Sequence, residues 1–113
     1  MLWEDWKVPK YVRSQSSPAD GRTSGIEALS TPVSRDVARH LVQHGPLTTK
    51  AVAEGLEITH ATAIRTLARL EQAGVVVGDV DRATRNGHTV IWSVDLARVD
   101  AIAGELSRFI RGE

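Results

Sequence analysis

The chain has 113 residues, and its 14 Lys and Arg balance 14 Asp and Glu, so the formal net charge is +0. This length fits one domain with its own core, and the balanced charge excludes a histone-like polybasic protein or an acidic solvating tail. Because the chain has no cysteine, disulfides, thiolate zinc sites and a cysteine nucleophile are also excluded. A nucleic-acid binder with positive charge gathered on one face stays open.

Residues 1–28 are predicted to form a flexible arm, and residues 29–113 the folded domain. Trp3, Trp6 and Tyr11 lie early in this arm, and Ser, Gly, Pro and Asp are frequent after them. The arm is either a mobile tail or a segment that docks its aromatic side chains on a protein partner or a sister subunit. We see neither a signal peptide nor an apolar run long enough to span a bilayer, so we expect a cytoplasmic protein and no membrane.

The domain begins with a predicted helix. Thr31 and Pro32 are typical of an N-cap followed by proline in the first turn, and Gly45 with Pro46 predicts that the helix ends near Gln43. Apolar residues follow one face at helical spacing, namely Val33, Val37, Ala38 and Leu41.

Two further helices follow closely. Thr48 or Thr49 is expected to cap a helix over about residues 50–55, and Thr59 to cap a helix that reaches about Ala73. Because only about three residues separate these helices, the pair matches a helix-turn-helix unit.

After Gly74 the hydrophobic period changes to that of strands. Val75–Val77 and Thr89–Val94 are short and rich in β-branched residues, and the segment between them is polar and carries the Asn86–Gly87 turn signal. This pattern predicts a β-hairpin with a long charged tip, the shape called a wing when it follows a helix-turn-helix.

Asp95 is predicted to cap a last helix, over about residues 95–111. Its apolar stripe is two-sided, so it either packs on its own domain or pairs with the same helix of a second copy. Since the domain is small, we favour a homodimer. The interface residues that we expect are Leu96, Val99, Ile102, Ala103, Leu106, Phe109 and Ile110.

Three motifs make residues 29–95 resemble the winged helix-turn-helix repressors of the ArsR type, with MarR-type regulators as near relatives. The first is the run LSTPVSR at residues 29–35, and the second is GPLT at residues 45–48, followed by Val52, Ala53 and Leu56. The third is THAT at residues 59–62, followed by Leu67, Leu70 and the AGV run at residues 73–75. The resemblance implies a mainly α fold with a small β-hairpin (α+β), in which a three-helix core carries a wing and a C-terminal dimerisation helix.

The resemblance also implies that helix 59–73 enters the major groove of double-stranded DNA while the wing, residues 78–88, meets the backbone or minor groove. On a helical wheel centred on Leu67, Thr62, Arg65 and Arg69 point away from the core. Arg65 can present a forked donor to guanine, whereas Thr62 and Thr66 can reach phosphate or a thymine methyl. The expected DNA-contacting residues are Lys50, Thr59, His60, Thr62, Arg65, Thr66, Arg69, Arg82, Arg85, Asn86 and His88. For each of them a solvated surface side chain is the alternative.

Charge in this region is close to balanced. From Thr59 to Trp92 the arginines exceed the acids by only one formal charge, and Asp79 and Asp81 are expected to pair with Arg82. Non-specific affinity for DNA should therefore be low, and binding should depend on geometry and base contacts.

The sequence favours neither an enzyme nor a metal or cofactor site. Ser34, Asp36 and His40 are residue types of a hydrolase triad, but Ser34 and Asp36 face different ways on one helix. His40 and His44 have a metal-compatible spacing but no third ligand in view, so a histidine pair at a helix end is the better interpretation.

The resemblance therefore implies a dimeric, sequence-specific repressor that reads a palindromic operator. The alternative is a winged helix that binds proteins instead of DNA, through the arm or the last helix. A steep loss of binding with rising salt would favour DNA.

Overall fold

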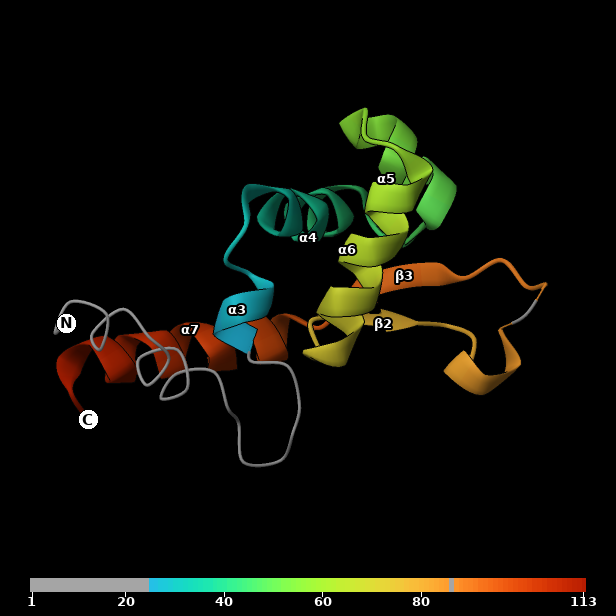
Figure 1. The fold of residues 1–113 in the computed structure, drawn as a ribbon. Helices are drawn as coiled ribbons and strands as arrows, with labels where there is room; N and C mark the ends of the chain where they lie inside the picture. Colours follow the sequence, from blue (N-terminus) through green and yellow to red (C-terminus); the bar gives the residue numbers. More distant parts are fainter. Residues whose placement is uncertain (1–24, 86) are drawn as a thin grey trace, which may run out of the picture.

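The computed structural model describes residues 25–85 and 87–113, which form a mainly helical body with one small antiparallel sheet (Figure 1). The elements in chain order are α3 (Gly25–Ala28), α4 (Pro32–His44), β1 (Leu47–Thr48), α5 (Thr49–Leu56), α6 (His60–Gln72), β2 (Val76–Gly78), the 3-10 turn η1 (Arg82–Thr84), β3 (Ile91–Val94) and α7 (Leu96–Arg111). The predicted combination of helices and a β-hairpin is confirmed.

Side-chain caps fix where the helices begin. The hydroxyl of Thr31 accepts a hydrogen bond from the Ser34 amide at 3.3 Å, and α4 ends one residue later than predicted, before Gly45 at φ +82°. Because L side chains rarely adopt that backbone conformation, glycine suits this stop.

The helix-turn-helix unit consists of α5 and α6. Thr48, not Thr49, caps α5 by accepting from the Ala51 amide at 3.1 Å, and Thr59 caps α6 by accepting from the Thr62 amide at 3.1 Å. Only residues 57–59 separate the two helices, and Glu57 makes the turn in the left-handed region at φ 57°. The predicted three-residue turn is therefore confirmed.

The sheet has three strands in the order β1-β3-β2, one more than the predicted hairpin. In β1, Leu47 pairs with Trp92 and Thr48 with Ile91, while Val76 of β2 pairs with Val94. A strand of two residues is too short to show alternation, so the sequence pattern does not reveal β1.

Residues 25–28, expected in the arm, belong to the packed body. They form α3, in which Ala28 is fully buried, and a Cβ at Gly25 would collide with the side chain of Ile102 on α7. The close approach of α3 to α7 explains why a small residue occupies this place. The rest of the predicted arm, with Trp3, Trp6 and Tyr11, lies outside the described residues.

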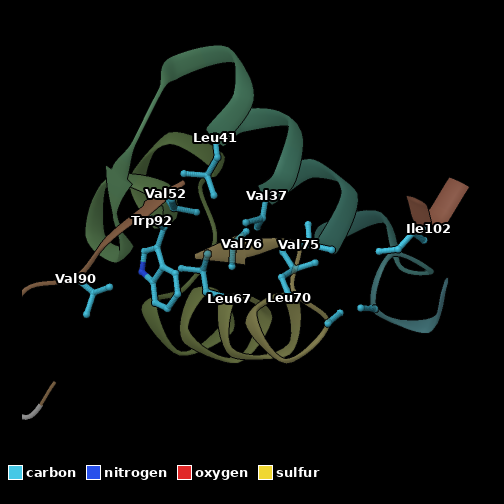
Figure 2. Close-up of a cluster of buried hydrophobic side chains, with 12 residues drawn as sticks. Val37, Leu41, Val52, Leu67, Leu70, Val75, Val76, Val90, Trp92 and Ile102 are labelled. Carbon is cyan, nitrogen blue, oxygen red and sulfur yellow. The ribbon is translucent and has the colours of Figure 1, made fainter. Parts of the chain in front are cut away.

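One hydrophobic core joins the three central helices to the sheet (Figure 2). Val37 and Leu41 of α4, Leu67 of α6 and Trp92 of β3 point toward one another in this view, while Ile102 of α7 lies apart at the far end. Because such buried positions are close-packed, truncating any of these aliphatic side chains to alanine should cost about 2–5 kcal/mol of stability.

The wing and α7 project from opposite ends of this body (Figure 1). The Asp95 carboxylate caps α7 by accepting from the Arg98 amide at 3.1 Å, as predicted. Within residues 25–85 and 87–113, none of the helices has the length and apolar character needed to cross a membrane.

Candidate nucleic-acid interface

The exposed side of α6 carries the polar residues predicted to face DNA. Arg65 and Arg69 are exposed, and Thr62 is half-buried. One guanidinium nitrogen of Arg65 lies 3.5 Å from the hydroxyl of Thr62, which in turn accepts from the hydroxyl of Thr59 at 2.9 Å. This chain of contacts orients Arg65 along the first turns of the helix.

Beside this row, α6 and the start of α4 enclose an open groove of about 480 Å³. Both Arg65 and Arg69 line it, together with Thr31 and Ser34 of the α4 N-terminus. The predicted arginines are thus brought to one surface depression that also includes the positive end of a helix dipole.

Thr66 departs from the prediction. It is only 6% exposed and lines the bottom of the groove beside Arg65 and Arg69, so it presents much less surface than the prediction assumed. The wheel assumed one core direction at Leu67, but both α4 and α5 pack on α6, which widens the buried arc to include Thr66.

A second depression, of about 440 Å³, brings together residues from three elements. Its lining includes Lys50 near the start of α5, His60 in the first turn of α6, and His88 beyond the wing tip. The Lys50 ammonium is exposed and lies 4.0 Å from the Glu54 carboxylate, a surface ion pair of little strength that leaves its charge available. The sequence predicted a DNA contact for each of these three residues, but only the fold shows that they lie close together.

The wing is closed at its base by Asp79. Its amide donates to the Ile91 carbonyl at 3.0 Å, and its carboxylate accepts from the Ile91 amide at 2.8 Å. The Asp79 carboxylate therefore stabilises the hairpin backbone, a role different from the expected pairing with Arg82. Arg82 is exposed in η1, and Asn86 lies outside the described residues.

Arg85 also departs from the prediction. Its guanidinium does not extend toward the wing tip but turns back to Glu71 on α6, with Nη1 to Oε1 at 3.1 Å and Nη2 to Oε2 at 2.8 Å. The same guanidinium donates to the Val80 carbonyl at 2.9 Å and lies 5.1 Å from the ring centroid of Trp92. With both side chains of the pair 21% exposed, Arg85 is committed to a contact within the protein.

The Glu71 carboxylate is held in its charged form by this pairing. The hydrogen bonds from Arg85 lower the pKa of Glu71 below its usual value, and partial burial works in the opposite direction to a smaller extent. Sequence reasoning missed Glu71, because 14 residues separate it from Arg85 and no local periodicity connects a helix end to a wing.

The last helix divides into two parts. Ile102, expected in a dimer interface, is 4% exposed and packs against its own domain, and half-buried Val99 joins the same core. The strongly exposed apolar side chains are Leu96, Leu106, Phe109 and Ile110. Ala103 and Leu106 also line an apolar groove of about 390 Å³ between α7, α3 and α4.

His40 and His44 lie together at the end of α4, with ring centroids 4.3 Å apart. The His40 ring packs where a Cβ at Gly55 would clash with it, so it contacts α5. Partial burial of this ring, followed by the charge of His44, lowers the pKa of His40 below its usual value. In the described part of the chain, no three metal-ligating side chains gather in one place.

Residues 29–79 match the model of a helix-turn-helix domain family. None of the curated proteins matches the chain. Among solved structures, an ArsR family transcriptional regulator is similar at a TM-score of 0.61 and 18% identity, covering 78% of this chain and 90% of that one.

Two other structures have the same arrangement. A transcriptional regulator from Thermotoga maritima has a TM-score of 0.52 and 19% identity, covering 79% of this chain and 66% of that one. A third structure is BpsR from Bordetella bronchiseptica, whose DNA binding is regulated by 6-hydroxynicotinic acid. It has a TM-score of 0.53 and 19% identity, and the match covers 90% of this chain and 69% of that one. The matched domain, the hairpin of β2 and β3 and the fold shared with these structures identify the chain as a winged helix-turn-helix protein.

Proposed function

We propose that this protein is a sequence-specific DNA-binding transcriptional regulator of the ArsR type. The observation that carries the proposal is the exposed side of α6, where Arg65 and Arg69 line one depression. Lys50 and His88 join the first turn of α6 in a second depression, and Arg82 is exposed on the wing. On this fold, a helix with small and hydroxylated residues in its first turns is suited to a major groove.

In the proposed complex, α6 lies in the major groove and reads bases with its N-terminal half. The Arg65 guanidinium donates two hydrogen bonds to a guanine edge. Because the contact with Thr62 already restricts this side chain, binding costs less conformational entropy. Arg69 and Thr62 contact phosphate or base from the same face. Phosphate contacts fix the register of the helix, whereas the base contacts give specificity.

The phosphate contacts are proposed to come from the elements that flank α6. Lys50, His60 and His88 line one depression and would meet the same stretch of backbone. Thr59 presents the amide end of α6, where a phosphate is favoured by the helix dipole. On the wing, Arg82 is the exposed arginine that can reach the backbone or minor groove.

We propose further that the protein binds as a homodimer through α7. Leu106, Phe109 and Ile110 expose apolar side chains that a water-facing helix end would not normally gather, and Ala103 lies beside them. Pairing of this helix with its copy would bury them and place two α6 helices about one DNA turn apart. A palindromic operator follows, and a dimer seated on it would repress by excluding the transcription machinery.

The test is selection of duplexes from a random pool, followed by affinity measurements at two salt concentrations. We expect one enriched palindrome, with affinity that falls steeply as salt rises because phosphate contacts release counterions. Absence of an enriched motif would exclude the regulator. An enriched motif without inverted repeats would keep DNA binding but exclude the proposed dimer.

A protein-binding winged helix is the second candidate. Phe109 and Ile110 are 63% and 73% exposed, and the chain has no net charge, both of which suit a protein partner. This function predicts no enriched duplex and weak dependence on salt. It also predicts that Phe109→Glu abolishes capture of the partner while Arg65→Ala leaves it intact.

A further inference from the structure

We propose that Arg85 and Glu71 form a clamp that sets the position of the wing relative to α6, and that Arg85 acts on DNA only through this clamp. The inference rests on the proposed function, because it concerns how the same surface is arranged. It makes Arg85 and Glu71 positioning residues, although the one is an arginine on a wing and the other an acid close to a DNA-binding surface.

The Arg85 guanidinium makes a bidentate contact with the Glu71 carboxylate. Two parallel hydrogen bonds of 3.1 and 2.8 Å join Arg85 to Glu71, and such bidentate charge-assisted pairs are directional as well as strong. Because the two residues come from the last turn of α6 and from the wing, the pair fixes one element against the other. A lysine in place of Arg85 could keep the charge but not the fork.

Further contacts hold the guanidinium itself in place. It donates to the Val80 carbonyl from two nitrogens, at 3.2 and 2.9 Å, and its flat face lies near the ring of Trp92. A Cβ at Gly78 would lie 2.8 Å from the Val90 side chain and 3.0 Å from a guanidinium nitrogen, so glycine in β2 leaves room for both side chains. The Arg85 guanidinium therefore has contacts from both wing strands and from the wing backbone in addition to Glu71, whereas an ordinary surface ion pair has only the two charged groups.

At its base the wing is held by half-buried Val80, which packs against the core, but its tip has few contacts outside the wing apart from the clamp. Of the residues between Asp79 and Val90 that the structure describes, Arg82, Thr84 and His88 are all exposed. The hydrogen bonds that shape the tip are local, from the Thr84 amide to the Asp81 carbonyl and from the His88 amide to the Arg85 carbonyl. Arg85 is therefore the residue through which Arg82 and His88 keep a fixed distance from α6.

Removal of a single acid gives an experiment in which two hypotheses predict opposite signs. If Glu71 only repels DNA, Glu71→Gln should strengthen operator binding, as removal of any nearby negative charge does. If Glu71 holds the wing, the same variant should weaken operator binding by about tenfold, the loss expected for a charge-assisted hydrogen-bonded pair. The matched control is Asp81→Asn, which removes the same charge from an exposed wing residue outside the clamp.

The second arm compares conservative variants of two wing arginines. Arg85→Lys should weaken binding about as much as Glu71→Gln, whereas Arg82→Lys should have little effect because a phosphate accepts either cation. In the Glu71→Gln background, Arg85→Gln should cause no further loss. The slope of log affinity against log salt should stay unchanged in Arg85→Gln, whereas loss of a real phosphate contact reduces it by about 0.9.

A third readout needs no DNA and separates the clamp from the proposed function. In the unliganded full chain, the Arg85 Nη–H groups that bond Glu71 should give protected ¹⁵N signals that disappear in Glu71→Gln, while thermal unfolding checks that the variant stays folded. Arg85 Nη–H groups that exchange as fast as those of Arg82 would overturn the proposal, as would stronger operator binding by Glu71→Gln. If no duplex binds the wild type while the signal is protected, only the proposed function fails.

Discussion

The indole nitrogen of Trp92 donates a hydrogen bond to the hydroxyl of Thr49 at 3.0 Å, across 43 residues of sequence. Trp92 is 5% exposed and lies in the central strand β3, whereas Thr49 is the first residue of α5. One side chain therefore ties the sheet to the first helix of the helix-turn-helix, and its other face meets Arg85.

This contact gives the first prediction. Thr49→Val keeps the shape of the side chain but leaves the indole N–H without its acceptor, so we expect a loss of about 1–3 kcal/mol in the free energy of unfolding, measured in urea. Thr89→Val, at an exposed position, should change it little. Combining Thr49→Val with Trp92→Phe should give much less than the sum of the two losses, and simple additivity would contradict the coupling.

The second prediction separates two roles of Thr59. Thr59→Ala removes the α6 cap and should cost about 1 kcal/mol of stability. Thr59→Asp caps equally well and should keep the unfolding free energy, yet it should weaken operator binding because it places a negative charge beside the proposed phosphate. Thr59→Asn, neutral and a good cap, is the control that should preserve both. Tight DNA binding by Thr59→Asp would contradict a phosphate contact at the N-terminus of α6.

The third prediction concerns base reading by Arg65. Arg65→Ala should weaken binding to the selected operator by about 1–3 kcal/mol and relax preference at one base pair of each half-site. Competition assays with single-substitution duplexes measure both effects. Arg108→Ala, which removes an equal charge from the last turn of α7, should leave the base preference intact. Uniform weakening over all duplexes would reduce Arg65 to a phosphate contact.

The fourth prediction tests the dimer. Phe109→Glu and Leu106→Glu introduce charges into the proposed α7 interface and should convert the dimer to a monomer at micromolar concentration, by light scattering. Ser107→Glu adds the same charge to an adjacent exposed residue and serves as the control. A monomeric mass for the wild-type chain would exclude the dimer directly.

The fifth prediction follows from the lowered pKa of His40. The ordinary value is 6.5, so between that pH and the lower pKa of the folded state the unfolded chain binds more protons than the folded one. Stability should therefore fall as the pH drops below about 6.5. His40→Gln should flatten this part of the curve, and His44→Gln should reduce it, because it removes the second cause of the shift.

Local chemistry in the sequence was sufficient to predict most of the fold. Thr31, Thr59 and Asp95 each cap a helix because the hydroxyl or carboxylate of one residue reaches an amide three residues on, a relationship that spacing alone reveals. Periodicity likewise located the apolar faces of the helices, because it depends only on residues that are close in the sequence. By contrast, β1 exists only because β3 returns beside it, and α3 only because α7 offers it a surface.

The candidate site was predicted less completely. Arg65 and Arg69 lie on the exposed face, as the wheel indicated, since their positions depend only on helix geometry. Thr66 and Ile102 are buried and Arg85 is paired with Glu71, and the sequence did not reveal this because it depends on elements that are distant along the chain. A single wheel cannot count how many elements pack on a helix, and no pattern of arginines identifies the carboxylate that binds one of them.

The bidentate pair between α6 and the wing places a joint constraint on two distant positions. A substitution at residue 71 that removes the carboxylate leaves a partly buried cation behind, while a change at residue 85 leaves a partly buried anion, so either change alone is unfavourable. In an alignment of related chains, positions 71 and 85 should therefore covary as acid with arginine or lose both together. Position 65, which faces outward and is proposed to read bases, should instead follow the sequence of each operator.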